Sequence, residues 1–372
     1  MTELFNRGGL QIASEEYTSE EKLQFAEKII LGTPGKLQYR HKEVRKKLSG
    51  YTDTSFYWMR RYNLIIGSVA LARRMYTFNN TQYNCCLVRN FAINAPMKRA
   101  DSPGKQKKAA KKNEKPDNLL KLITSKLFSD AAALMDMPYF SQPLICYATV
   151  EDKNIRSRHM VESHGLQQIR TLATIFFSRF YPKNKLELNK PNAIEISELK
   201  NLLQTAYNSY HFFNCDYINF SDNYFIYKIN NRIVFGAQVH VVTWEILHIP
   251  GIIGFLAKHF LQHLPVMNKL INLKNFKYLS VDAIYIADNV LNKADAFFET
   301  LCHKFKATKM LFLTDTDSPL YNNISKIKNK GLLNIMSDKK AVHLYAKLFN
   351  CTQLTIEKLK ENPMYTEARD SV

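Results

Sequence analysis

Two pairs of carboxylates follow apolar stretches of the chain and precede polar, helix-like segments. Glu151 and Asp152 come directly after the apolar run 144–150, and Asp315 and Asp317 stand in the same place in the second half. Acidic side chains there usually cap the N-terminus of the following helix. The alternative is chemical, because carboxylates at strand ends can bind the ammonium group of an amine substrate.

Residues 98–115 carry a dense cluster of positive charge. Eight lysines and arginines there stand against two acids, Asp101 and Glu114, which gives this stretch a net charge of +6. Clustered basic side chains attract phosphate groups. The run has no interleaved aromatic residues to stack nucleobases, so nucleic acid is a disfavoured partner that stays open. A solvated surface segment is the plain alternative.

Residues that could bind a metal are scattered along the sequence. His259 and His263 are four residues apart and would share one face of a helix, but no third ligand stands at a suitable spacing. The six cysteines form no C-x-x-C pair and lie mostly in apolar runs. We therefore expect no metal site, and reduced thiols in a cytoplasmic protein.

One sequence pattern that could position such residues occurs twice. Residues 144–166 and 311–332 each run from an apolar stretch through an acidic turn and a polar helix to a Gly-Leu pair. In a chain of 372 residues this repeat predicts two related domains in tandem, because the repeats of a solenoid are shorter. The predicted divisions are residues 1–182, a linker 183–192, residues 193–350 and a loose charged tail 351–372.

Hydrophobic periodicity predicts helices and strands along most of the chain. The predicted helices are 20–31, 43–48, 118–135, 155–163, 197–210, 290–305 and 318–329. The predicted strands are 56–61, 64–76, 83–93, 144–150, 168–180, 194–196, 224–229, 233–249, 276–287, 310–314, 332–336 and 341–349. A lysine-rich insertion, 97–118, interrupts the first half, and an amphipathic one, 250–275, interrupts the second.

This order of elements resembles the GNAT superfamily of acyl-CoA-dependent N-acyltransferases. The family often has N-x-x-A-x-x-L-Y-x-x-x-G-F after its fifth strand, and Asn154, Ser157, Met160 and Gly165 are similar to that pattern. The segment 91–99 is similar to the family's fourth strand as it leaves for the cofactor loop. The resemblance implies an α+β protein of the three-layer type. It would have two tandem GNAT-like domains, each a mixed, mostly antiparallel sheet flanked by helices.

The resemblance also implies where acyl-CoA would bind. In the family the fourth and fifth strands diverge, the pantetheine arm pairs with their edges, and the pyrophosphate lies at a helix N-terminus. The implied cofactor-binding residues of this chain are Phe91, Ala92, Ile93, Lys98, Arg99, Gly104 and Asn154. The equivalent loop of the second half, 287–292, has no glycine and contains an acid. We therefore expect only the N-terminal half to bind the cofactor.

The resemblance leaves the catalytic residues unassigned. Many family members use a tyrosine on the last helix as a general acid, and the matching positions here are Val161 and Ile327. For a general base the second half offers Asp282, whereas the first half offers Arg89 and Asn90 at the corresponding strand.

The leading hypothesis is transfer of an acyl group from acetyl-CoA or a longer acyl-CoA to an amine of a small molecule or lipid. One alternative is a non-catalytic binding protein of the same fold, since the loop glycines and tyrosines are missing. Another is a peripheral, lipid-modifying acyltransferase at an anionic membrane surface, because of the insertion 250–275 and the net charge of +19. Packing of that insertion within the protein is the plain alternative.

The sequence favours a cytoplasmic location, with a peripheral position at the inner face of the membrane as a variant. It has no basic start followed by an apolar stretch, as a signal peptide would have, and no uncharged apolar run of about 18 residues. The acceptor amine, the acyl length and the oligomeric state stay open.

Overall fold

A computed structural model describes residues 2–7, 10–14, 19–33, 35–49, 53–62, 64–79, 81–93, 143–260, 264–337 and 341–368. The strands of this part are β1 (Thr2–Arg7), β2 (Leu10–Ser14), β3 (Gln38–His41), β4 (Thr54–Arg61), β5 (Leu64–Phe78), β6 (Thr81–Ile93), β7 (Leu144–Glu151), β8 (Gln167–Ser178), β9 (Tyr224–Ile229), β10 (Arg232–His248), β11 (Phe276–Ile286), β12 (Lys309–Asp315) and β13 (Ala341–Phe349). They form one sheet of 13 strands in the order β1-β2-β4-β5-β6-β7-β13-β8-β12-β11-β10-β3, with β9 on β10.

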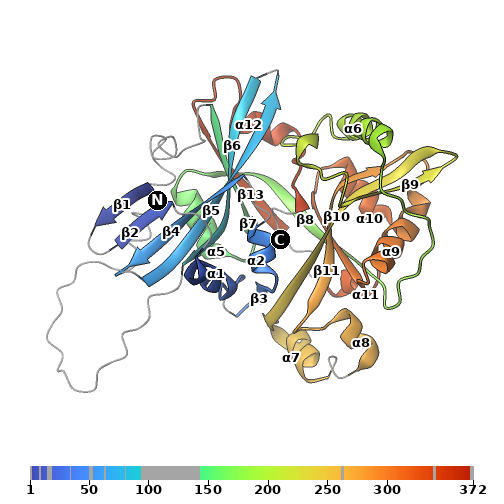
Figure 1. Cartoon of the computed structure of the whole chain (residues 1–372), viewed down its shortest axis with the longest axis horizontal. Coiled ribbons are helices and arrows are strands. Elements are labelled where there is room, and N and C mark those ends of the chain that lie inside the picture. Colours follow the sequence, from blue (N-terminus) through green and yellow to red (C-terminus); the bar gives the residue numbers. More distant parts are fainter. Residues whose placement is uncertain are drawn as a thin grey trace.

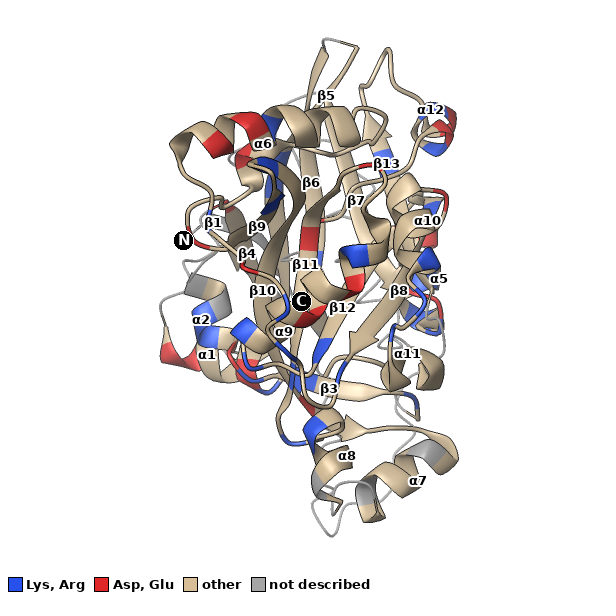
Figure 2. Cartoon of the chain, turned by 90° about the vertical axis from the view of Figure 1, so that its right-hand side faces the viewer, with Lys and Arg blue, Asp and Glu red and all other residues tan. Residues whose placement is uncertain are grey.

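Helices lie on both faces of this sheet (Figure 1). They are α1 (Glu20–Glu27), α2 (Val44–Ser49), α5 (Ile155–Ser163), α6 (Ala193–Ala206), α7 (Gly251–His259), α8 (Pro265–Leu270), α9 (Ala294–Lys304), α10 (Pro319–Lys326), α11 (Leu332–Met336) and α12 (Ile356–Glu361), with 3-10 turns η1 (Cys215–Tyr217) and η3 (Leu291–Lys293). The α7 and α8 helices lie at one end of the molecule (Figure 1, Figure 2). Among the described helices, none has both the length and the apolar character needed to cross a membrane.

Most of the predicted strands and helices are confirmed, but two short strands are wrong. Residues 194–196 belong to α6, because Asn192 and Glu195 form a capping box that begins a helix there. Residues 332–336 form α11, which starts at Gly331, whose φ is 86°. The predicted helix 118–135 lies outside the described residues.

Two parallel strand pairs mark the two halves of the chain. β6 and β7 are paired from Asn84–Leu144 to Val88–Ala148, and β11 and β12 are paired over three residues up to Val281–Phe312. In both pairs the strands continue beyond the last paired residues, so each half contains a gap in its sheet. All other strand pairs in the described part are antiparallel.

The two halves exchange strands. β13 of the second half lies between β7 and β8 of the first half and is antiparallel to both. β8 in turn pairs with β12 of the second half along seven residues, from Leu172–Asp315 to Ser178–Lys309. The sequence pattern also suggests that 332–336 and 341–349 form a closing strand pair, which is wrong because β13 pairs with β7 and β8. The mixed, mostly antiparallel α+β sheet with flanking helices is confirmed, and the sheets of the two halves merge into one.

The segment after Cys351 is packed, so the prediction of a loose tail is wrong. Leu354, Leu359 and Met364 are at most 1% exposed, and they pack on the β6, β7 and β13 side chains of one sheet face. The charged residues of α12 point outward, while its apolar residues complete a core that the strands leave uncovered. The chain then continues in extended form between the two halves.

Candidate functional site

The N-terminal gap lies between Arg89–Ile93 of β6 and Thr149–Glu151 of β7. On its far side this part of β6 pairs with β5, where Ser68 faces Ala92. On its far side this part of β7 pairs with β13, where Leu344 faces Thr149. The two strand edges that face each other across the gap carry backbone N–H and C=O groups. An extended ligand could pair with such edges as an additional strand would.

The predicted cofactor residues fall into three groups. Phe91, Ala92 and Ile93 lie on the part of β6 that borders the N-terminal gap. Asn154 is the N-cap of α5, and its Oδ1 accepts a hydrogen bond of 3.1 Å from the backbone N–H of Ser157. The remaining three, Lys98, Arg99 and Gly104, lie outside the described residues.

At the C-terminal gap, between β11 and β12 beyond Val281 and Phe312, tyrosine hydroxyls of the chain itself bind carbonyl oxygens of β11. The hydroxyls of Tyr224 and Tyr207 donate hydrogen bonds of 2.9 Å to the carbonyl oxygens of Ala283 and Ile284. Burial raises the pKa of both tyrosines, so they remain neutral donors. A Cβ at Gly236 would lie 2.6 Å from the Tyr224 hydroxyl, so glycine there makes room for the ring.

The packed C-terminal segment 364–368 is hydrogen-bonded to both strands of the same gap. The backbone N–H of Met364 donates to Asp315 at 2.9 Å, and the Thr366 hydroxyl donates to the Leu313 carbonyl at 3.3 Å. The backbone N–H of Ala368 donates to Asp282 at 2.7 Å. Asp282, the predicted base candidate of this half, therefore anchors the chain's own backbone in the gap.

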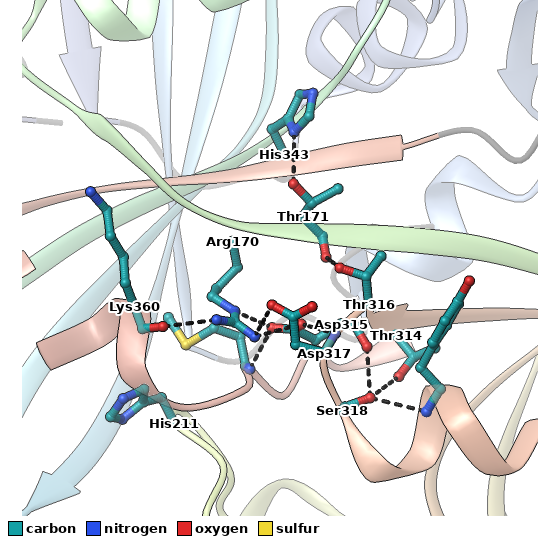
Figure 3. A network of polar contacts seen from close by, with 12 residues as sticks. Arg170, Thr171, His211, Thr314, Asp315, Thr316, Asp317, Ser318, His343 and Lys360 are labelled. Carbon is teal, nitrogen blue, oxygen red and sulfur yellow. Dashed lines mark hydrogen bonds and ion pairs between the residues drawn. The ribbon is translucent and has the colours of Figure 1, made fainter. Parts of the chain in front are cut away.

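The interpretation of the strand-end acids as helix caps is wrong. Asn154 caps α5 and Ser318 caps α10, where the Ser318 Oγ accepts from the N–H of Tyr321. Asp315 instead receives two hydrogen bonds from Arg170 (Figure 3). Asp152 pairs with the imidazole of His343 at 3.0 Å, and this bond lowers the pKa of Asp152.

A pocket between the halves connects the two gaps. Thr149 and Leu313, the first residues of β7 and β12 beyond the paired stretches, both line it. Its other lining residues are Arg74, Met75, Leu87, Tyr147, Phe212, Tyr217, Leu344, Tyr365, Thr366 and Glu367. The pocket is thus bordered by β5, β6, β7, β12, β13 and the C-terminal segment.

A charged cluster at this pocket was missed by the sequence analysis. The buried Arg74 side chain forms ion pairs with Asp53 at 2.5 Å and with Glu367 at 3.3 Å. Its guanidinium also lies 5.1 Å from the ring centroid of Tyr217. Asp53 and Arg74 belong to the β4–β5 hairpin, whereas Tyr217 and Glu367 come from distant segments that only the fold brings to it.

The remaining candidate residues from the sequence show no arrangement for catalysis or metal binding within the described part of the chain. Val161 and Ile327, which stand where the resemblance places a tyrosine, are buried in apolar clusters. Arg89 is buried. Among the described residues no three metal-ligating side chains gather at one place. His263, of the predicted histidine pair, lies outside the described residues.

Comparisons with known proteins identify the fold. No protein-family model and no curated protein matches the sequence. A structure of Saccharomyces cerevisiae N-myristoyltransferase with bound myristoyl-CoA matches with a TM-score of 0.53 and 8% identity, over 93% of this chain and 84% of that chain. Another structure of the same enzyme, with myristoyl-CoA and inhibitors, matches with a TM-score of 0.54 and 7% identity, over 92% of this chain and 80% of that chain. A probable N-acyltransferase from Enterococcus faecalis matches with a TM-score of 0.41 and 10% identity, over 91% of this chain and 72% of that chain.

The two solved N-myristoyltransferase structures share the arrangement of this chain over most of their length. Together these observations show that the chain has the GNAT fold of these structures.

Proposed function

We propose that the protein is an acyl-CoA-dependent N-acyltransferase that holds its acyl-CoA in the N-terminal gap. The observation that carries this proposal is the contrast between the two gaps. At the C-terminal gap the chain itself binds the strand carbonyls, through the hydroxyls of Tyr207, Tyr224 and Thr366, and the pocket that remains there is lined in part by Tyr207 and Thr366. Within the described residues, β6 and β7 do not pair with each other beyond Val88 and Ala148, and two diverging strand edges of this kind suit a pantetheine arm. Solved structures of this fold carry myristoyl-CoA.

In this proposal the thioester lies near Thr149, where the N-terminal gap opens into the pocket. The acceptor amine enters from the pocket, and its nitrogen attacks the thioester carbonyl carbon. The carbon–sulfur bond then breaks, the thiolate of CoA leaves, and the proton of the amine passes to a base. Glu367 provides a carboxylate in the pocket lining for that proton or for the incoming ammonium group. The lysine-rich segment with Lys98, Arg99 and Gly104 would meet the phosphates of CoA.

Calorimetry with acetyl-, octanoyl- and myristoyl-CoA tests the binding step, with free CoA and free fatty acid as controls. We expect one molecule of acyl-CoA to bind per chain. The acyl-chain length that binds with the highest affinity would define the substrate class. The absence of binding by every acyl-CoA at saturating concentration would reject the proposal. Binding without acyl transfer to any of a panel of amines would favour the non-catalytic alternative.

A matched pair of variants locates the bound cofactor. Thr149→Phe places a ring in the N-terminal gap, and we expect it to weaken acyl-CoA binding by about tenfold or more. Leu313→Phe makes the equivalent change at the gap that the chain itself fills, and we expect acyl-CoA affinity to stay within about threefold of the parent. A larger loss of acyl-CoA affinity in Leu313→Phe than in Thr149→Phe would place the cofactor in the C-terminal half.

A further inference from the structure

The α7 and α8 helices form a tip that connects β10 to β11 and exposes large apolar side chains. Ile252 is 78% exposed, Phe255 58%, Phe260 56% and Leu264 52%. These residues lie within one short stretch of the chain at one end of the molecule (Figure 1). Soluble proteins rarely leave several neighbouring large apolar side chains in water unless another surface covers them.

The side of α7 that faces the protein carries small residues. Gly254 and Ala257 are buried there, and a Cβ at Gly254 would lie 1.8 Å from the carbonyl oxygen of Ile249. Ala257 packs in an apolar cluster with Leu270 and Ile271. An ordinary surface helix buries its large apolar residues and exposes its polar ones. Here Ile252, Phe255 and Phe260 face outward, and the ring contacts of Phe255 are with His259 and Phe260 of the same tip.

The charge of the tip limits what could cover it. Residues 246–275 contain no aspartate or glutamate and include three lysines. Two of these, Lys269 and Lys274, are exposed. In Figure 2 no acidic residue is drawn on α7 or α8. Near the base of the tip Glu245 is paired with Arg40 at 2.5 Å. Apolar residues among lysines, without acids, are the pattern of segments that bind anionic lipid surfaces.

We propose that the α7–α8 tip docks on an anionic membrane surface. The side chains of Phe255 and Phe260 enter the boundary between headgroups and acyl chains, and Lys269 and Lys274 lie against the lipid phosphates. The two short helices then stay in the plane of the interface, because neither is long enough to enter the bilayer core. This inference does not depend on the proposed acyl transfer.

Flotation of the full chain with vesicles tests the proposal. The vesicles are phosphatidylcholine alone, or phosphatidylcholine mixed with phosphatidylserine. We expect the protein to float with the mixed vesicles and to remain in solution with phosphatidylcholine. The double variant Phe255→Asp/Phe260→Asp should lose binding by about tenfold or more, since each change removes an inserted apolar side chain. Ile194→Asp, at an 82% exposed position of α6, is the matched control and should bind as the parent does.

A second pair of variants tests whether the lysines of the tip contribute to binding, and it leaves the apolar side chains of the tip unchanged. Lys269→Glu/Lys274→Glu should weaken binding to the mixed vesicles by about tenfold or more. Lys326→Glu/Lys328→Glu makes the same change in net charge on exposed residues elsewhere and should have little effect. Circular dichroism and light scattering accompany each variant.

Three results would overturn the proposal. One is the absence of flotation with mixed vesicles, and another is unchanged flotation of the properly folded tip variants. The third is a parent protein that is a dimer in solution, becomes a monomer as Phe255→Asp/Phe260→Asp, and does not float. That outcome would show that the tip contacts a second copy of the chain.

Discussion

Arg170 of β8 and Asp315 of β12 form a two-bonded ion pair across the strands that join the two halves. The guanidinium donates to both carboxylate oxygens, at 2.7 and 2.9 Å, and also to the Lys360 carbonyl at 2.8 Å (Figure 3). Asp315 has no exposed side-chain surface, and it also accepts from the backbone N–H of Met364. One carboxylate thus links the exchanged strand β8 to the C-terminal segment that fills the C-terminal gap.

The first prediction concerns this pair. Asp315→Asn leaves the Arg170 charge without its buried partner, so the free energy of unfolding should fall by about 3–5 kcal/mol. Because the C-terminal segment loses its anchor at Met364, limited proteolysis should cut the chain after Lys360 more readily. Asp317→Asn is the control, since Asp317 pairs with the same arginine but is 71% exposed, and it should cost about 1 kcal/mol or less. Urea denaturation that shows equal losses for both variants would contradict the assigned role of Asp315.

The second prediction concerns the hydroxyls that fill the C-terminal gap. Tyr224→Phe removes the donor to the buried Ala283 carbonyl, so the free energy of unfolding should fall by about 1–3 kcal/mol. Tyr181→Phe, at a 58% exposed ring, should change it by less than about 0.5 kcal/mol. In both variants acyl-CoA affinity should match the parent, since the proposed site is in the other half. A selective loss of acyl-CoA binding by Tyr224→Phe would count against that placement.

The third prediction concerns Lys309, which is 2% exposed and lies 4.4 Å from the ring centroid of Phe276. Burial lowers the pKa of its ammonium group from 10.5 to about 7. Lys309→Met keeps an unbranched apolar side chain and removes the buried charge, so it should raise the free energy of unfolding at neutral pH by on the order of 3 kcal/mol. The control Lys304→Met, at an exposed lysine near Phe225, should have little effect.

The gain in stability from Lys309→Met should also depend on pH, in a direction that follows from the lowered pKa. The unfolded chain holds this proton up to its ordinary pKa of 10.5, whereas the folded protein releases it near pH 7. The contribution of Lys309 to stability is therefore lowest below pH 7 and rises between pH 7 and 10.5. The advantage of Lys309→Met should accordingly shrink as pH rises through that window. A difference between the two proteins that is constant across the window would show that the lysine is charged in the folded state.

The fourth prediction rests on the proposed function. Glu367→Gln removes the carboxylate from the pocket between the halves, so the rate of acyl transfer should fall by about 10²–10⁴-fold while acyl-CoA affinity changes little. The pH dependence of the rate should lose its acidic limb. Glu361→Gln, an exposed acid of α12, should leave both the rate and the affinity unchanged. Full activity of Glu367→Gln would assign the base to another group.

The sequence by itself determined the local elements of this protein. The helix 155–163 is found at its predicted residues, and the strands 144–150, 224–229 and 341–349 lie within a residue of theirs. Periodicity and turn residues act over a few positions, so a short window contains the information. Residues 194–196 show the limit of that information, because the capping box formed by Asn192 and Glu195 overrides the β-branched pattern.

Only the tertiary structure decided which strands are neighbours and where the charged cluster lies. Leu344, Tyr345 and Ala346 of β13 are consecutive and all buried, and this apolar run does not say whether the strand pairs within its own half or with β7 and β8. The apolar residues of the C-terminal segment pack on a sheet face that this exchange of strands leaves uncovered. Arg74 and Glu367 are far apart in sequence, and their contact follows from the path of the tail between the halves. Pairing over such separations depends on the whole core, and no local pattern encodes it.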